Sequence, residues 1–159
     1  RSFSRLEPQM LDHEAKRARI SVIAELASEL PRLWADSTQI QQVLINLLRN
    51  AFDSLRQSQV LDPIVIMRTK RIDSGDVCFE VEDNGEGIEE SDLAKVFDAY
   101  YSTRAEGMGM GLAICRSVIE AHHGALEAGA SPLGGARFTF TLPLAEATET
   151  RDAAEPARP

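Results

Sequence analysis

Residues 36–58, DSTQIQQVLINLLRNAFDSLRQS, form the clearest element of the chain. Apolar residues recur here at spacings of three and four over about four turns, which predicts an amphipathic helix laid on a hydrophobic core. The apolar positions are Ile40, Val43, Leu44, Leu47, Leu48, Ala51 and Leu55. Asp36 and Gln39 have the spacing of a capping box, so we expect the helix to begin there and to end near Ser58.

The segments outside this helix have alternating or helical patterns that predict a sheet and further helices. Strands are expected at 20–24, 64–70, 77–82, 125–130 and 137–142. Other helices are expected at 6–18, 91–97 and 112–122, the last with Leu112, Ile114 or Cys115, Val118 and Ile119 buried. Strands interleaved with three core helices predict an α/β fold. We expect a two-layer α/β sandwich, in which a mixed sheet of about five strands carries three helices on one face.

The composition limits the classes of function. The chain has 159 residues, a net charge of -8 and 43% apolar residues, which fits one soluble globular domain. No apolar run approaches the roughly 18 residues that cross a bilayer. No basic stripe stands out, so nucleic acid and anionic membranes are disfavoured as partners. Cys78 and Cys115 lack metal-type spacing, and we expect buried thiols in a reducing compartment.

Three polar residues on the long helix form the first candidate site. Asn46, Asn50 and Asp53 are spaced i, i+4 and i+7, so they share one side, which borders the apolar stripe. Buried amides are costly without partners. Taken alone, the three residues are best interpreted as loop caps or water-facing groups. Two further motifs favour a functional interpretation.

The second motif is Asp83-Asn84-Gly85-Glu86-Gly87-Ile88, at the end of a predicted strand. A carboxylate there can accept a hydrogen bond from an exocyclic amine such as N6 of adenine. Gly85 and Gly87 allow a tight turn and a close approach of the backbone to a flat base. Because Asx-Gly turns are common, this motif alone is only a modest signal.

The third motif is Gly107-Met108-Gly109-Met110-Gly111-Leu112, which runs into a predicted helix. Backbone N–H groups at a helix start bind anions, so phosphates fit here, and the alternating glycines suit a closing lid. The spacing is wrong for a dinucleotide fingerprint. The chain also lacks a Walker A motif and the His-Arg-Asp and Asp-Phe-Gly sequences of protein kinases.

In this order and at these distances, the three motifs resemble the N, G1 and G2 boxes of the ATP-binding superfamily that contains gyrase, Hsp90, histidine kinases and mismatch-repair ATPases. Residues 96–104, VFDAYYSTR, are similar to the F box of histidine kinases. The match covers roughly residues 19–144. The chain therefore looks like the catalytic and ATP-binding domain of a sensor histidine kinase.

The resemblance implies roles for single residues. Asn50 matches the asparagine that binds Mg²⁺ through its side-chain oxygen, and Asn46 matches the one that lines the phosphates. Asp83 matches the adenine-reading aspartate, with Gly87 beneath the base, and Arg104 falls where the family often has a lysine near the γ-phosphate. Asn46, Asn50 and Arg104 are thus the expected catalytic residues. The other expected nucleotide contacts are Asp53, Gly85, Ile88, Phe97, Tyr101, Thr103, Gly107, Met108, Gly109, Met110, Gly111 and Leu112.

Position 46 separates the chemistries of the superfamily. Its hydrolysing members carry a glutamate four residues before the metal-binding asparagine, where it activates water. Asn46 cannot act as a base at neutral pH, so we expect ATP to be kept for transfer to another acceptor. A departure from the family pattern lies at Gly135-Ala136, where the family usually has Gly-Thr or Gly-Ser.

The acceptor histidine is expected outside this chain. His13-Glu14 copies the start of the family's H box, but no proline follows in the expected place, and a two-helix hairpin cannot fit before the first strand. Residues 1–18 are therefore expected to end a preceding helical dimerisation or linker segment. Residues 19–145 are expected to form the catalytic domain, and 146–159 a disordered tail.

The resemblance also implies partners and a location. The expected partners are ATP with Mg²⁺, the dimerisation and histidine-phosphoacceptor domain of the same protein, and a response regulator. We expect this piece to be monomeric and cytoplasmic, and its parent to be a homodimer. An inner-membrane anchor in the parent is compatible with this location. The alternatives are a nucleotide-binding regulatory module without transfer, an anti-sigma-factor-type serine kinase, and a hydrolysing ATPase, the last weakened by Asn46.

Overall fold

The computed structural model describes residues 9–31, 33, 35–98 and 111–144. Its elements, in chain order, are α1 (Gln9–Ala18), β1 (Ser21–Glu25), α2 (Ser37–Ser58), β2 (Ile64–Arg71), β3 (Val77–Asp83), the 3₁₀ turn η1 (Glu90–Asp92), α3 (Gly111–Ala121), β4 (Ala125–Ala130) and β5 (Ala136–Leu142). The strands that the sequence predicts are all present.

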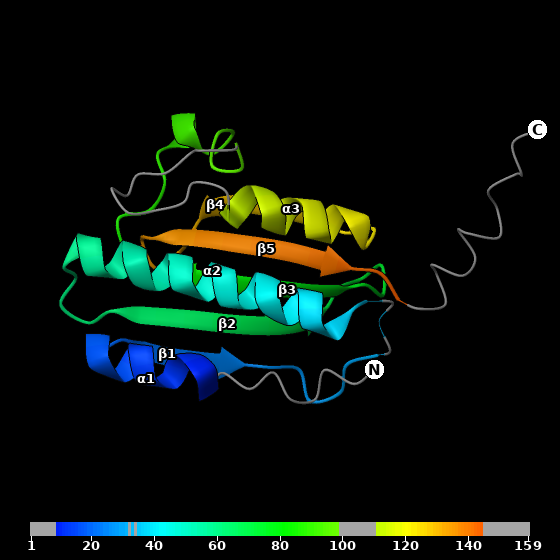
Figure 1. The fold of residues 1–159 in the computed structure, drawn as a ribbon, viewed down its shortest axis with the longest axis horizontal. Helices are drawn as coiled ribbons and strands as arrows, with labels where there is room; N and C mark the ends of the chain where they lie inside the picture. The colour runs from blue at the N-terminus through cyan, green and yellow to red at the C-terminus, as the bar shows by residue number, and fades with distance from the viewer. Residues whose placement is uncertain (1–8, 32, 34, 99–110, 145–159) are drawn as a thin grey trace, which may run out of the picture.

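The strands form one five-stranded sheet in the order β1-β2-β3-β5-β4. β1 pairs with β2 in parallel, and the other neighbours are antiparallel. A parallel pair needs a crossover connection, and α2 provides it between β1 and β2. Figure 1 shows α1, α2 and α3 over one face of this sheet. The predicted two-layer sandwich with a mixed sheet is confirmed.

Helix α2 begins and ends where the sequence predicts. The Asp36 side chain accepts hydrogen bonds from the backbone nitrogens of Thr38 (2.9 Å) and Gln39 (3.2 Å), which makes Asp36 the N-cap. All seven predicted apolar positions are buried, and Phe52, only 1% exposed, is buried with them. Phe52 widens the stripe because α2 packs against both the sheet and α3.

Alternation along β3 divides its side chains between the two faces of the sheet. Val77, Phe79 and Val81 join the core beneath the helices. Phe79 lies opposite Phe140 of β5 in the register, and the two rings stack with centroids 4.7 Å apart and planes 7° apart. This pair ties the two central strands together under α2.

A buried histidine connects the start of α2 to the end of α3. The backbone N–H of Asp36 donates to Nε2 of His122 at 3.2 Å. The proton of the ring must then lie on Nδ1, which is 2.7 Å from the carbonyl oxygen of Val118. His122 therefore fixes the end of α3 to the start of α2.

Two local predictions need correction or refinement. The predicted helix at 91–97 is wrong: η1 is a single 3₁₀ turn, and turns follow it to Phe97. A segment this short gives too few hydrogen bonds to offset the cost of helix nucleation. In α3, Cys115 is buried at 1% exposure whereas Ile114 is 52% exposed, which decides between the two alternatives.

The N-terminal helix packs on the same core as the rest of the fold. Leu11 and Ala15 of α1 are buried with the residues of α2 and the sheet. The division of the chain at residues 18 and 145 stays a prediction, and residues 1–8 and 145–159 lie outside the described part. No helix among the described residues is long and apolar enough to cross a membrane.

The cap of α2 can be tested by substitution. Asp36→Ala should lower the free energy of unfolding by about 1 kcal/mol, because two backbone N–H groups lose their acceptor. Asp36→Ser keeps a side-chain oxygen and should stay close to the parent. Urea unfolding followed by circular dichroism measures both, and equal losses in the two variants would contradict the capping role.

Candidate functional site

A row of four polar side chains on α2 connects the parts of the candidate site. Asn46, Asn50, Ser54 and Ser58 follow each other at intervals of four residues, so they lie on one side of the helix. The row extends about 18 Å along the helix, at 1.5 Å per residue. One end lies beside α3, and the other beside the loop that follows β3. The sequence had indicated only the first two members.

At the α3 end, Asn46 is held by two neighbours. Its Nδ2 donates to Sγ of Cys115 at 3.6 Å, and Nε2 of Gln42 donates to its Oδ1 at 3.2 Å. Burial raises the pKa of the Cys115 thiol, and the hydrogen bond from Asn46 acts in the opposite direction. The thiol is therefore neutral, and it acts as a weak acceptor that orients the amide.

Near the middle of the row, side-chain oxygens are available as ligands for a metal ion. Asn50 and Asp53 are both half-buried on α2, and Oδ1 of Asp53 lies 3.2 Å from Nη1 of Arg56, one turn further on. Hard cations such as Mg²⁺ prefer oxygen ligands, and few protein ligands are needed when phosphates and waters complete the shell. The amide oxygens of Asn46 and Asn50 suit such a cation. The described residues hold no cluster of three or more His, Cys, Asp or Glu side chains of the metal-binding kind.

At the other end of the row, the Asp83 carboxylate is buried at 2% exposure. Its Oδ1 accepts from the backbone nitrogens of Gly85 at 2.8 Å and Ala136 at 3.4 Å. Within the described part of the chain, no hydrogen bond to Oδ2 is found, and no fully buried side-chain oxygen lacks a partner. Oδ2 is thus the atom that can accept from a ligand.

The environment of Asp83 favours a proton or a donor. Burial raises the pKa of its carboxyl group, the two backbone donors lower it, and the charge of the adjacent Glu82 raises it again. The pKa lies above the usual value for aspartate. A carboxylate in this condition gains from a ligand that donates a hydrogen bond to it.

The loop that carries Asp83 is fixed from two sides. Asn84 accepts from the backbone nitrogen of Ile64 at 2.9 Å and donates to the carbonyl of Asp62 at 2.8 Å. The backbone nitrogen of Glu86 donates to Oγ of Ser58 at 2.9 Å. The last member of the polar row therefore holds the loop against α2.

Three glycines let the backbone close around Asp83. Gly87 has φ +79°, a region that favours glycine, and a side chain on Gly85 would approach Oγ of Ser54 to 2.9 Å. A Cβ atom on Gly135 would lie 2.2 Å from Oδ1 and 2.3 Å from the carbonyl oxygen of Asp83. Gly135 was not among the predicted site residues. The glycine doublet before the last strand was the available signal.

Four further predicted contacts lie around this loop and α3. Ile88 and Leu112 are partly buried against the core. Phe97 packs edge-on against Phe138 with centroids 6.2 Å apart, and the guanidinium of Arg116 lies 4.9 Å above its ring. Gly111 is the first residue of α3. The remaining predicted contacts lie outside the described residues: Tyr101, Thr103, Arg104, Gly107, Met108, Gly109 and Met110.

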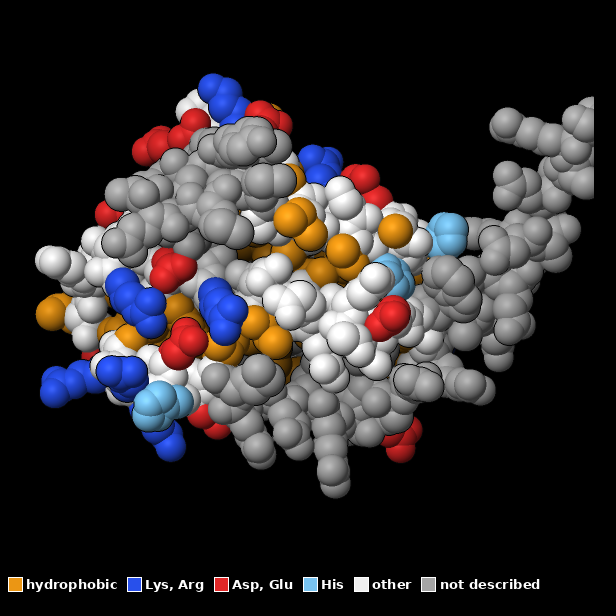
Figure 2. All heavy atoms as spheres, in the orientation of Figure 1, with side chains coloured by type: hydrophobic (Ala, Val, Ile, Leu, Met, Phe, Trp, Pro, Cys, Tyr) orange, Lys and Arg blue, Asp and Glu red, His pale blue; other side chains and the backbone are white. Residues whose placement is uncertain are grey.

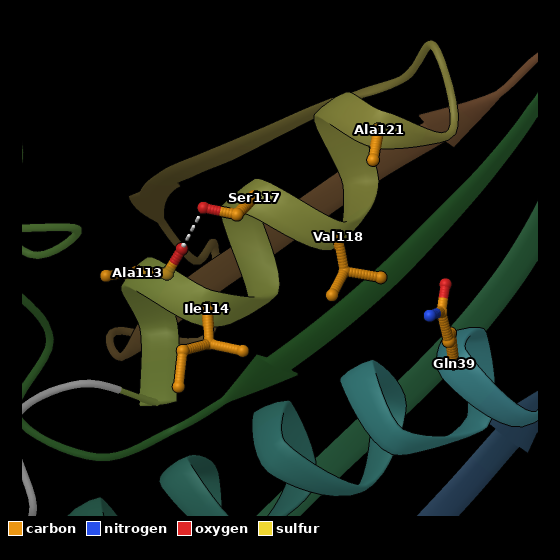
Figure 3. Close-up of a pocket in the computed structure, with 6 residues that line it drawn as sticks. All are labelled: Gln39, Ala113, Ile114, Ser117, Val118 and Ala121. Atoms are coloured by element: carbon orange, nitrogen blue, oxygen red, sulfur yellow. Dashed lines mark hydrogen bonds between the residues drawn. The ribbon is translucent and has the colours of Figure 1, made fainter.

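A separate apolar groove of about 340 Å³ lies between α3 and the start of α2. Figure 2 shows hydrophobic side chains gathered on this face of the molecule. In Figure 3, Ile114 and Val118 of α3 point toward the α2 side of the groove, near Gln39. None of the predicted nucleotide contacts lines it, so we do not assign the groove to the candidate site.

The two-layer α/β sandwich thus brings together a buried carboxylate at the end of β3, a row of amides and hydroxyls on α2, and α3. The family described as histidine kinase-, DNA gyrase B-, and HSP90-like ATPase matches residues 35–146, and the chain belongs to this family. The family predicted from the sequence is confirmed.

Known proteins of the family place the chain more narrowly. It is 39% identical over 130 residues to the C4-dicarboxylate transport sensor protein DctS of Rhodobacter capsulatus, covering 82% of this chain and 20% of that protein. The nucleotide-free catalytic domain of histidine kinase ThkA superposes with a TM-score of 0.75 at 28% identity, over 86% of both chains. Full-length ShkA in complex with AMPPNP gives 0.73 at 30% identity, over 85% of this chain and 28% of that one. The chain is a catalytic domain of the sensor histidine kinase type.

The close approach of Gly135 to Asp83 gives a test of the site's packing. Gly135→Ala should lower the free energy of unfolding by about 1–3 kcal/mol, since its Cβ would overlap the Asp83 carboxylate. Gly129→Ala is the matched control, because a Cβ there meets nothing within 4 Å. Thermal unfolding compares the two. A Gly135→Ala variant as stable as Gly129→Ala would contradict the described contact.

Proposed function

We propose that this domain binds Mg-ATP along the polar row of α2 and donates the γ-phosphoryl group to a histidine located upstream of residue 1. The observation that carries the proposal is the row itself, which extends from the loop beside the buried Asp83 carboxylate to α3 at Cys115. A ligand bound along it meets a hydrogen-bond acceptor at one end and amide oxygens at the other. Mg-ATP matches both ends, because adenine carries an amine donor and the metal ion on the triphosphate takes oxygen ligands.

At the base end, we assign recognition of the adenine amine to Asp83. Its Oδ1 is occupied by two backbone donors, so the carboxylate cannot rotate freely, and we assign Oδ2 as the acceptor for the base. N6 of adenine is a donor, and it relieves the cost of burying the charge. Gly85 and Gly87 allow the base to lie close to the loop.

At the phosphate end, we assign the metal to Asn50 and support of the phosphates to Asn46. Mg²⁺ usually takes only one or two protein oxygens, and when bound it would neutralise charge on the β- and γ-phosphates. The proposed lid contacts of Arg104, Gly107, Met108, Gly109 and Met110 rest on the sequence motif. Gly111 at the start of α3 adds helix N–H groups to the same end.

Transfer is favoured over hydrolysis because the phosphate end holds amides where a base would be needed. Asn46 is bonded to Cys115 and Gln42 and cannot take a proton from water. In transfer, a nitrogen of the acceptor imidazole forms the new bond to phosphorus as the bond to the ADP oxygen breaks. The imidazole releases its own proton. The domain contributes position and charge neutralisation.

The proposed partners follow from this division of labour. The acceptor histidine lies in a dimerisation domain of the parent protein, and the phosphoryl group then passes to a response regulator. We propose a cytoplasmic location, because Cys78 and Cys115 are free buried thiols and ATP is the donor.

Labelled ATP tests the transfer directly. The domain is incubated with Mg²⁺ and γ-labelled ATP, with and without the acceptor region of the same protein. Acid-labile, alkali-stable label should appear only with that region present. Asn50→Ala should abolish it, whereas Gln41→Ala, an exposed change on the same helix, should not. ATP binding without label in every pairing would leave only a nucleotide-binding module.

Base recognition by Asp83 can be tested with a change of nucleotide. In Asp83→Asn the amide oxygen should stay on the donors from Gly85 and Ala136, which places the NH₂ group against the base. Affinity for ATP should fall by about tenfold or more, and affinity for ITP, whose 6-keto group is an acceptor, should rise relative to ATP.

Calorimetry with the two nucleotides measures this exchange of preference. Asp73→Asn removes a charge from an exposed turn and serves as the control. An unchanged ratio of ATP to ITP affinity in Asp83→Asn would exclude Asp83 from base recognition.

A further inference from the structure

Glu82 is a buried carboxylate that the proposed function does not use. It precedes Asp83 on β3, and because side chains alternate along a strand, it points to the face of the sheet opposite the helices. Its residue exposure is only 2%. A charge so well covered is costly unless hydrogen bonds compensate for it, so its partners reveal what it does.

Two side chains form hydrogen bonds with Glu82. Nη1 of Arg68, on the neighbouring strand β2, donates to its Oε1, and Oγ of Ser131 donates to its Oε2 at 2.8 Å. Arg137, opposite Glu82 on β5, adds a positive charge nearby. Burial opposes ionisation, but these two hydrogen bonds and the charges of Arg68 and Arg137 together outweigh it, and the pKa of Glu82 lies below the usual value. Glu82 is therefore ionised at neutral pH, and Ser131 is held by a charge-assisted bond.

Ser131 opens the turn between β4 and β5 and organises it. Its backbone nitrogen donates to the carbonyl of Gly135 at 2.8 Å, and its carbonyl accepts from Gly134 at 3.0 Å. Its Oγ also accepts from the backbone nitrogen of Leu133 at 3.0 Å. The side chain that binds Glu82 thus also sets the shape of the turn.

The same turn reaches Asp83 from the other side. Gly135 lies against the Asp83 carboxylate, and Ala136 donates to its Oδ1 at 3.4 Å. The carbonyl oxygens of Gly134 and Gly135 face Gly87, where a Cβ would approach them to 3.2 and 3.3 Å. The turn therefore holds the end of β3 on both faces, through Glu82 on one and Asp83 on the other.

We propose that Glu82 and Ser131 are positioning residues for base recognition: together they fix the 131–136 turn, whose backbone holds the Asp83 carboxylate in one orientation. Neither residue touches the base. Without their bond, Gly135 and Ala136 can shift, and Oδ1 and Oδ2 of Asp83 lose their distinct roles. The proposal rests on the proposed ATP binding and adds the determinant of selectivity between purines.

The strand supplies a matched control. Glu80 lies two residues before Glu82 on the same face and is also buried, at 6% exposure. It pairs with Lys70 at 2.9 Å and lies 3.8 Å from the same Arg68 guanidinium. The structure gives it no bond to the turn. Glu80→Gln therefore reproduces the loss of a buried charge on this face without releasing Ser131.

The test is the ratio of ATP to ITP affinity, measured by calorimetry on the domain in each variant. This ratio does not depend on the folded fraction, since both nucleotides bind only folded protein. Glu82→Gln and Ser131→Ala should each reduce the ratio about fivefold or more. Ser131→Thr, which keeps the hydroxyl, and Glu80→Gln should keep the wild-type ratio.

The double variant Glu82→Gln/Ser131→Ala separates this role from general weakening. Its ratio of ATP to ITP affinity should be no lower than that of the less selective single variant, since the two substitutions disrupt the same hydrogen bond. Wild-type selectivity in Glu82→Gln and Ser131→Ala would overturn the inference and leave the proposed function intact. A wild-type domain that did not prefer ATP over ITP would instead overturn base recognition by Asp83, and the inference with it.

Discussion

The rotation of α2 about its own axis is the constraint on which the site depends. Its apolar stripe must face the sheet and α3, and eight buried side chains hold it there. Once that rotation is fixed, every residue on the adjacent side points into the same space. The packing of this stripe on the hydrophobic core sets the direction of Asn46, Asn50, Ser54 and Ser58, and Oγ of Ser58 also donates to the carbonyl oxygen of Ser54 at 2.7 Å. A helix packed any other way would direct these groups into solvent or bury them without partners.

Adjacent carboxylates on β3 show how local partners determine the state of a buried charge. Among the described residues, the Asp83 carboxylate accepts hydrogen bonds from backbone N–H groups only, and its pKa is raised. Glu82 has the guanidinium groups of Arg68 and Arg137 and the hydroxyl of Ser131 around it, and its pKa is lowered. Both are nearly inaccessible, so burial alone does not separate them. The undercompensated carboxylate is the one that faces the proposed ligand, where an incoming donor has most to contribute.

Local patterns predicted much of this molecule because they report local physics. The helical period and the cap at Asp36 located α2 within a residue, and the strand-ending Asp83 motif located the loop. The predictions missed contacts made across the fold. Ser54 and Ser58 matter only because the loop folds back onto α2, and Gly135 only because its turn reaches Asp83, 52 positions earlier in the sequence. Phe52 is buried in the common core although it was not among the predicted apolar positions. The lid residues of the glycine motif stay predictions.

The two hairpins of the sheet carry different restrictions on their length. The turn at 72–76, between β2 and β3, is closed by its own backbone bonds, and its tip is exposed. Most surface hairpins tolerate inserted residues at such a tip. The 131–136 turn is bonded to β3 on both faces of the sheet, so an added residue would have to break one attachment or the other. Inserted labels and epitopes should therefore be tolerated in the 72–76 turn, whereas the attachments of the 131–136 turn to β3 fix its length.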